Sequence, residues 1–187
     1  MNEDALILGC QKGDRGSQKA LYDKYASKML AICLRYVGDK MEAEDILQEG
    51  FMKIFTNFYK YESTGALGGW IRTVMVNTSI EHYRKNKRNI IDLRENDYET
   101  VNQSFDEGLI EKLDAKVILG LISKLPEGYR QIFNLYAIEG YKHSEISAML
   151  NISEGTSKSQ YSRAKKFLQN LILKKYHIDI HHVERGF

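Results

Sequence analysis

The sequence predicts an all-α protein with two small helical domains, an N-terminal helical bundle and a C-terminal helix-turn-helix domain, joined by a flexible acidic linker. Apolar residues recur at three- and four-residue spacing through much of the 187-residue chain, which is the periodicity of amphipathic helices. A single proline, Pro126, and few alternating apolar runs argue against strands. Turn signals between the periodic segments indicate several short helices rather than one long one.

Charge is segregated along the chain in a way that supports two domains. Residues 1–90 hold fourteen Lys/Arg and eleven Asp/Glu, residues 91–115 hold two and eight, and residues 116–187 hold eleven and six. Two mildly basic blocks therefore flank an acidic connector, a pattern typical of nucleic-acid-facing domains on a tether. We place the domains at 1–90 and 108–187, with the linker at 91–107.

Composition excludes several classes of protein. No apolar run reaches the roughly 18 residues of a membrane span, and the start of the chain lacks the basic and apolar stretches of a signal peptide. We therefore expect a cytoplasmic protein without membrane insertion. Cys10 and Cys33 are too few for a disulfide framework or a metal knuckle. No Ser/His/Asp set or phosphate-binding loop favours an enzyme, and we expect no catalytic residue and no cofactor.

The C-terminal tail carries three histidines. A His-x-x-x-His spacing could ligate a metal on a helix, but no carboxylate or cysteine at a firm spacing completes a site. We therefore assign no metal to these residues: His177, His181 and His182.

The first two helices are predicted at Ala5–Gln11 and Ser17–Val37. The former should stop near Gly13 and Gly16, and the latter carries apolar residues at helical spacing before ending at Gly38, the usual C-terminal glycine.

The next helix, about Met41–Phe58, has a strong apolar face and an acidic stripe opposite it. We place Ile46 outside the apolar face as an exposed aliphatic residue, which makes the stripe resemble a docking surface for another helix. A solvated acidic face is the alternative. The stripe consists of Asp45, Ile46, Gln48, Glu49 and Met52.

Residues 59–69 form a loop rich in glycine and small polar residues. It contains Tyr59 and Tyr61 and ends at the only tryptophan, Trp70. Aromatic side chains around a polar loop can stack on an unpaired base. Alternatively, they anchor a surface loop to the core.

A helix over Trp70–Lys87 is predicted to carry a polar stripe and to end in a cluster of cations. Such a cluster fits phosphate contact, with Asn77 as an amide able to contact a base. The alternative, complementing the negative end of the helix dipole, explains one or two cations better than four. The candidate DNA contacts here are Asn77, Arg84, Lys85 and Arg88.

After the linker, a helix is predicted from about Asp106 to Lys124, and Pro126 then sits near the start of the next helix. A short helix at Glu145–Leu150, a tight turn at 151–153 and a helix from Glu154 follow, as in a helix-turn-helix. Ser153 is the expected N-cap.

The last helix separates into a packing face and a basic face. Ser157 lies on the packing face, where a hydroxyl needs a local partner. The basic face has the cations and short hydroxyls of a groove-reading helix, although an ordinary solvated face has a similar pattern. Its candidate DNA contacts are Lys158, Ser159, Ser162, Arg163 and Lys166.

Three motifs in this order resemble the sigma-70 family of bacterial RNA polymerase initiation factors, in particular its extracytoplasmic-function (ECF) group. The segment from Gly38 to Phe51 looks like the core-polymerase-binding segment. Trp70-Ile71-Arg72 with Asn77 and Tyr83-Arg84-Lys85 looks like the −10 promoter segment. Residues 125–164 look like the −35-binding helix-turn-helix.

The resemblance implies a role for each candidate surface. Asp45, Gln48 and Glu49 would contact the clamp helices of the polymerase β′ subunit, and the loop at 59–69 would receive a flipped −10 base. The last helix would meet the −35 duplex, and the acidic linker would thread toward the RNA-exit channel. The expected partners are core RNA polymerase, through β′ and β, promoter DNA and an anti-sigma factor, with a monomer when free.

Four residues depart from the usual pattern of the family. Glu81 replaces a common Asp, Ser157 an apolar residue, Gln160 an Arg, and Glu62 a basic residue. They bear on the promoter sequence. The alternative function, a stand-alone helix-turn-helix regulator of duplex operators, leaves the acidic stripe and aromatic loop unexplained.

Overall fold

A computed structural model of the chain describes residues 2–62, 66–89 and 115–176, and every regular element within these ranges is a helix. The all-α prediction is therefore confirmed. The chain divides into two compact units, Met1–Asn89 and Ile90–Phe187, which are described separately below. None of the described helices is long and apolar enough to cross a membrane.

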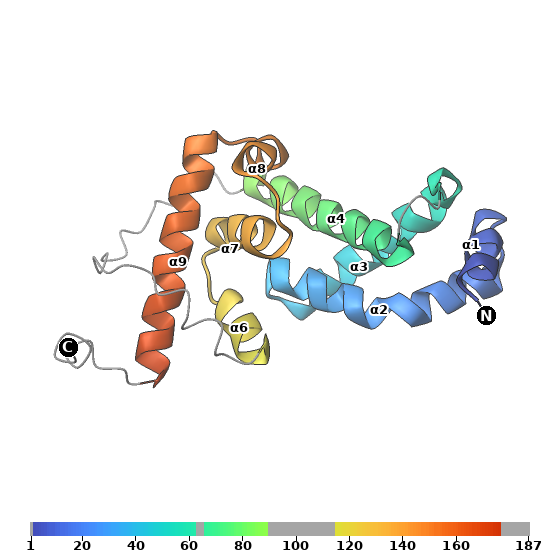
Figure 1. The fold of residues 1–187 in the computed structure, drawn as a ribbon, viewed down its shortest axis with the longest axis horizontal. Helices are drawn as coiled ribbons and strands as arrows, with labels where there is room; N and C mark the ends of the chain where they lie inside the picture. The colour runs from blue at the N-terminus through green and yellow to red at the C-terminus, as the bar shows by residue number, and fades with distance from the viewer. Residues whose placement is uncertain (1, 63–65, 90–114, 177–187) are drawn as a thin grey trace. The chain divides into compact units, whose positions relative to one another are not determined.

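The first unit is built on three long helices. Its elements are α1 (Glu3–Gln11), α2 (Arg15–Val37), α3 (Lys40–Asn57), the short 3-10 helix η1 (Phe58–Lys60) and α4 (Leu67–Asn89). Helices α2, α3 and α4 pack against one another in pairs, and α1 packs on α2 (Figure 1). Their facing sides form one apolar core that includes Leu21, Cys33, Tyr36, Ile54, Ile71 and Met75.

Side-chain caps explain where these helices begin. The Asp14 carboxylate accepts hydrogen bonds from the Ser17 backbone N–H at 2.7 Å and from its hydroxyl at 2.8 Å, and these bonds lower the Asp14 pKa. Helix α1 ends at Gln11 as predicted, and α2 starts at Arg15, two residues before its predicted start at Ser17. Asp39 caps α3 in the same way, directly after Gly38 ends α2 at a φ of 79°.

The second unit packs the short helices α6, α7 and α8 against the long helix α9. It contains α6 (Ala115–Ile122), α7 (Glu127–Phe133), the π-helical segment η2 (Asn134–Ile138), α8 (His143–Leu150) and α9 (Glu154–Tyr176) (Figure 1). The core residues are Leu121, Ile122, Leu125, Phe133, Ala164, Leu168 and Ile172.

The turn between α8 and α9 has the geometry expected of a helix-turn-helix. Asn151 adopts the left-handed conformation, with φ 54° and ψ 53°, and its N–H donates to the Ser147 carbonyl. Ser153 then accepts a 2.9 Å hydrogen bond from the Thr156 N–H, so the predicted N-cap is confirmed. The acidic linker, the helix start at residues 106–114 and the three tail histidines lie outside the described residues.

Candidate nucleic-acid interface

Helix α3 presents most of the predicted acidic stripe to solvent. Asp45, Gln48 and Met52 are exposed, Met52 to 69% of its surface, and Glu49 is partly exposed. Ile46 is the exception, since it is fully buried, and its predicted exposure is wrong. Helix α3 is covered by both α2 and α4, so its buried arc is wider than the face that packs on a single neighbour.

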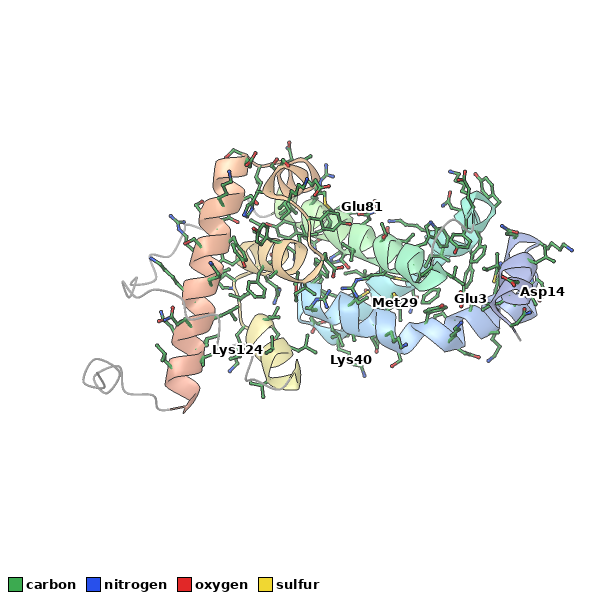
Figure 2. All side chains as sticks on the ribbon, in the orientation of Figure 1. Glu3, Asp14, Met29, Lys40, Glu81 and Lys124 are labelled. Atoms are coloured by element: carbon green, nitrogen blue, oxygen red, sulfur yellow. The ribbon has the colours of Figure 1, made fainter. Side chains whose placement is uncertain are left out.

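Ion pairs connect the stripe on α3 to helix α4. The Lys53 ammonium lies 2.8 Å from the Glu49 carboxylate and 2.7 Å from that of Glu81, which Figure 2 labels on α4. Lys85 lies 3.8 Å from the same Glu49 carboxylate. Burial alone would lower the Lys53 pKa, but hydrogen bonds to both carboxylates raise it, and the Lys53 hydrogen bond lowers the pKa of Glu49.

The two tyrosines of the predicted aromatic loop have different environments. Tyr59 is 68% exposed, whereas Tyr61 is 7% exposed, with its ring 5.2 Å from Trp70 and 6.0 Å from Phe58. The Gln11 amide donates a 3.2 Å hydrogen bond to the Tyr61 carbonyl. Tyr61 and the partly buried Trp70 thus anchor this segment to the core, as the alternative interpretation of the loop required. The Tyr59 ring stays exposed, with the Lys60 ammonium 5.5 Å from its centroid.

The polar stripe of α4 faces solvent as predicted. Asn77, Glu81, Arg84 and Lys85 are all exposed along one side of the helix, while residues between them enter the core. Arg88 also lies in α4, but its side chain is outside the described part. This surface therefore combines one amide and at least two cations, a combination that suits a nucleic-acid backbone and base edge.

Helix α9 exposes the predicted basic face. Lys158, Ser159, Ser162 and Arg163 are exposed, and Lys166 is partly buried. Lys158 pairs with Glu154 at 2.6 Å, which lowers the Glu154 pKa, and the Ser159 hydroxyl donates to the Thr156 carbonyl at 3.0 Å. Both groups are held by exposed local contacts, which water or a phosphate can replace at little cost.

The partner of Ser157 is a residue that the sequence did not single out. The Ser157 hydroxyl is fully buried and lies 2.9 Å from Nδ1 of His143, the first residue of α8. The imidazole stacks on Tyr136 with a 4.2 Å centroid separation and a 13° interplanar angle. The sequence predicts that the buried Ser157 hydroxyl needs a partner. It does not identify His143, because the geometry of the turn is what places this residue, fourteen positions earlier, beside Ser157.

Comparisons with known families match residues in both units of the chain. Residues 21–89 match Sigma-70 region 2, and residues 115–168 match Sigma-70, region 4. The two matches cover the bundle and the helix-turn-helix, and they define a sigma-70-type transcription protein.

Two curated relatives narrow the class to the ECF group, and one solved structure is also similar to the chain. ECF RNA polymerase sigma factor SigW of Bacillus subtilis is 30% identical over 174 residues, covering 87% of this chain and 92% of the relative. SigM of the same organism, also an ECF RNA polymerase sigma factor, is 29% identical over 152 residues, covering 81% and 92%. The Bartonella quintana sigma factor RpoE, crystallised with the anti-sigma factor NepR, gives a TM-score of 0.48 at 24% identity. The match covers 83% of this chain and 96% of the RpoE chain.

The chain belongs to the ECF group of the sigma-70 family of RNA polymerase sigma factors. Its function is accordingly that of a promoter-recognition sigma factor, and a stand-alone operator-binding regulator is not favoured.

Proposed function

We propose that the chain acts through two binding domains, residues 1–90 and 108–187, tethered by residues 91–107, and that it performs no catalytic step. One observation supports this division of labour most directly. A single three-helix bundle carries a solvent-facing stripe with two carboxylates on α3 and an exposed amide-and-cation stripe on α4. Two chemically different surfaces on one body suit a protein that joins a polymerase to DNA.

The α3 stripe is the proposed contact for core polymerase. Asp45, Gln48 and Glu49 offer carboxylate and amide groups to the β′ clamp helices, and exposed Met52 offers an adaptable apolar contact. Ile46 supports this surface from below, because its side chain is buried. The β subunit is a further proposed partner, which the family resemblance implies.

The α4 stripe and Tyr59 form the proposed −10 contact. The Asn77 amide hydrogen-bonds to a base edge, and Arg84 and Lys85 bind phosphates. The exposed ring of Tyr59 stacks on an unpaired base. Because these groups bind the melted strand better than the duplex, they shift the promoter toward the open state. Arg88, four residues after Arg84 in the sequence of α4, stays a proposed −10 contact.

Helix α9 is the proposed −35 contact. Lys158 and Arg163 supply charge for phosphates or base edges, while Ser159 and Ser162 allow close approach of the helix to the groove. Neither domain need bind DNA tightly alone, because both are held near the promoter by polymerase, which raises the effective concentration of each.

Regulation and location follow from the family rather than from contacts in this chain. We infer a cytoplasmic protein that is monomeric when free, needs no metal or other cofactor, and is held inactive by an anti-sigma factor that covers its binding surfaces. Pull-down of the full chain from its native host, with and without an inducing stress, would identify such a partner. Recovery of core polymerase alone under both conditions would contradict this part of the proposal.

The decisive experiment is transcription of genomic DNA by core polymerase with this protein, followed by mapping of the start sites. The proposal predicts new starts that share two sequence elements at a constant spacing, one near −10 and one near −35. Unchanged starts, or starts sharing only a single duplex site, would contradict two-element recognition.

A further inference from the structure

A polar contact lies inside the helix-turn-helix, where apolar packing is the rule. The hydroxyl of Ser157 has no exposure to solvent, and its hydrogen-bond partner is Nδ1 of His143 at 2.9 Å. A buried hydroxyl without a partner would cost free energy, so this bond holds the two residues together. The bond joins the first turn of α8 to the first turn of α9.

The imidazole is itself fixed from two sides. Its ring stacks on Tyr136 at 4.2 Å, and the Tyr136 ring lies 4.5 Å from that of Tyr161 on α9. Tyr136 projects from the π-helical segment η2, where the wider turn displaces side chains from their α-helical positions. The His143 ring also lies 5.9 Å from the Tyr161 ring, so three elements, η2, α8 and α9, converge on His143.

The contact sits directly behind the proposed DNA face. Ser157 precedes Lys158 and lies two residues before Ser159, so its inward bond determines which way these side chains point outward. At 100° per residue, a small rotation of α9 moves every base-contacting group together. Phosphate contacts tolerate such a movement better than base contacts, because base-edge hydrogen bonds need defined geometry.

We propose that His143 is a positioning residue for the recognition helix: through its hydrogen bond to Ser157 it sets the rotation of α9 and thereby the specificity of −35 recognition. This inference rests on the proposed −35 role of α9. It assigns His143 no contact with DNA. The hydroxyl of a neighbouring serine, Ser147 of α8, donates to the Ser144 carbonyl of its own helix, and Ser147 therefore provides a matched control.

The test measures a ratio of affinities with the assembled holoenzyme. Binding is compared on a promoter taken from the start-site mapping and on the same fragment with its −35 element replaced. Ser157→Ala and His143→Phe should each lower the ratio about tenfold, the effect of about one lost buried hydrogen bond, while Ser147→Ala leaves it unchanged. A loss of folded protein lowers both affinities equally, so the ratio separates positioning from stability.

Two further variants test whether the bond itself is responsible. The double variant His143→Phe/Ser157→Ala should lose no more than either single variant, because both remove the same contact. His143→Asn places an amide close to the Nδ1 position and should restore most of the ratio. Additive losses, or an unchanged ratio in both single variants, would overturn the proposal.

If replacing the −35 element does not weaken the parent holoenzyme, the −35 assignment fails instead. If Ser157→Ala does not fold, His143→Phe, which keeps the ring stacking, decides alone.

Discussion

At the scale of single residues, the two tyrosines near the end of α3 separate binding from folding. Tyr59→Ala removes an exposed ring and should slow opening of the −10 region without lowering the melting temperature. Tyr61→Ala removes a ring packed on Phe58 and Trp70 and should destabilise the first unit by about 3 kcal/mol. Permanganate footprinting measures opening and circular dichroism measures stability. Normal opening by Tyr59→Ala would remove this residue from the proposed base contact.

His143 makes the stability of the second unit depend on pH. Burial and the nearby Lys158 lower its pKa below the ordinary 6.5, partly offset by Glu154, while Tyr136 and Tyr161 cover the ring. The unfolded chain therefore binds this proton more readily than the folded one. The stabilisation is complete above pH 6.5 and is lost as the pH falls through the folded pKa.

Urea unfolding followed by circular dichroism at about pH 7.5 and about pH 5.5 tests this dependence. The parent should lose more unfolding free energy between the two conditions than His143→Phe. The only tryptophan, Trp70, lies in the first unit, so its fluorescence reports that unit separately. Equal losses in parent and variant would show that His143 does not titrate on unfolding.

Sequence periodicity predicted the exposed functional groups better than the buried ones. Asn77, Arg84 and Arg163 were placed correctly on exposed faces, because a polar stripe at helical spacing is visible in the sequence. Ile46 was misplaced because periodicity does not reveal how many neighbours cover a helix. The bond from Ser157 to His143 was missed because it depends on tertiary geometry across a turn.

At the scale of elements, the packing of α1 on α2 requires a glycine. A Cβ atom added to Gly9 would overlap the Ser17 side chain, including its Cβ, which cannot rotate away. Gly9→Ala should therefore destabilise the first unit by about 1–2 kcal/mol, since overpacking outweighs the helix propensity gained.

Gly69→Ala is the matched control, because nothing lies within 4 Å of its added Cβ and it also sits in a helix. It should be neutral or slightly stabilising. Thermal unfolding of the three proteins by circular dichroism makes the comparison. Equal midpoints for Gly9→Ala and Gly69→Ala would mean that α1 shifts freely on α2.

Most helices could be predicted, but their ends and irregularities could not. The N-cap at Ser153 is confirmed, because serine is a residue type that favours this position. Helix α4, in contrast, begins at Leu67, before the predicted start at Trp70. Gly68 and Gly69 suggested a loop, yet both lie in the first turn of α4, where the ring of Tyr25 leaves Gly68 only 3.3 Å for a Cβ atom. The π-helical segment has no sequence signal that we can identify.

At the scale of the whole molecule, the proposed polymerase contact can be tested by reversing one charge. Asp45→Lys should weaken binding to core polymerase about tenfold, because it places a cation within the exposed acidic stripe. Asp45 is a cleaner target than Glu49, whose replacement also breaks pairs with Lys53 and Lys85. Asp23→Lys, an equal charge change at an exposed position of α2 that breaks only a solvent-exposed pair with Lys19, should leave binding unchanged.

Fluorescence anisotropy of labelled protein titrated with core polymerase gives both affinities. Equal binding by Asp45→Lys and the parent would move the polymerase contact away from α3. Equal weakening by Asp45→Lys and Asp23→Lys would instead indicate long-range attraction to the net charge of the domain, which high salt would screen.

The close contact between α3 and α4 fixes the distance between two proposed binding surfaces of the first unit. Gly50 lacks a side chain, and the buried Met75 fills the space beside it, so the two helices interlock and cannot slide past each other. The offset between the proposed polymerase surface and the proposed −10 surface is then a constant of the domain. The domain therefore keeps the polymerase and the −10 element at a constant separation. Promoters with different spacing between their two elements must then be accommodated by a change in the DNA or in the rest of the chain.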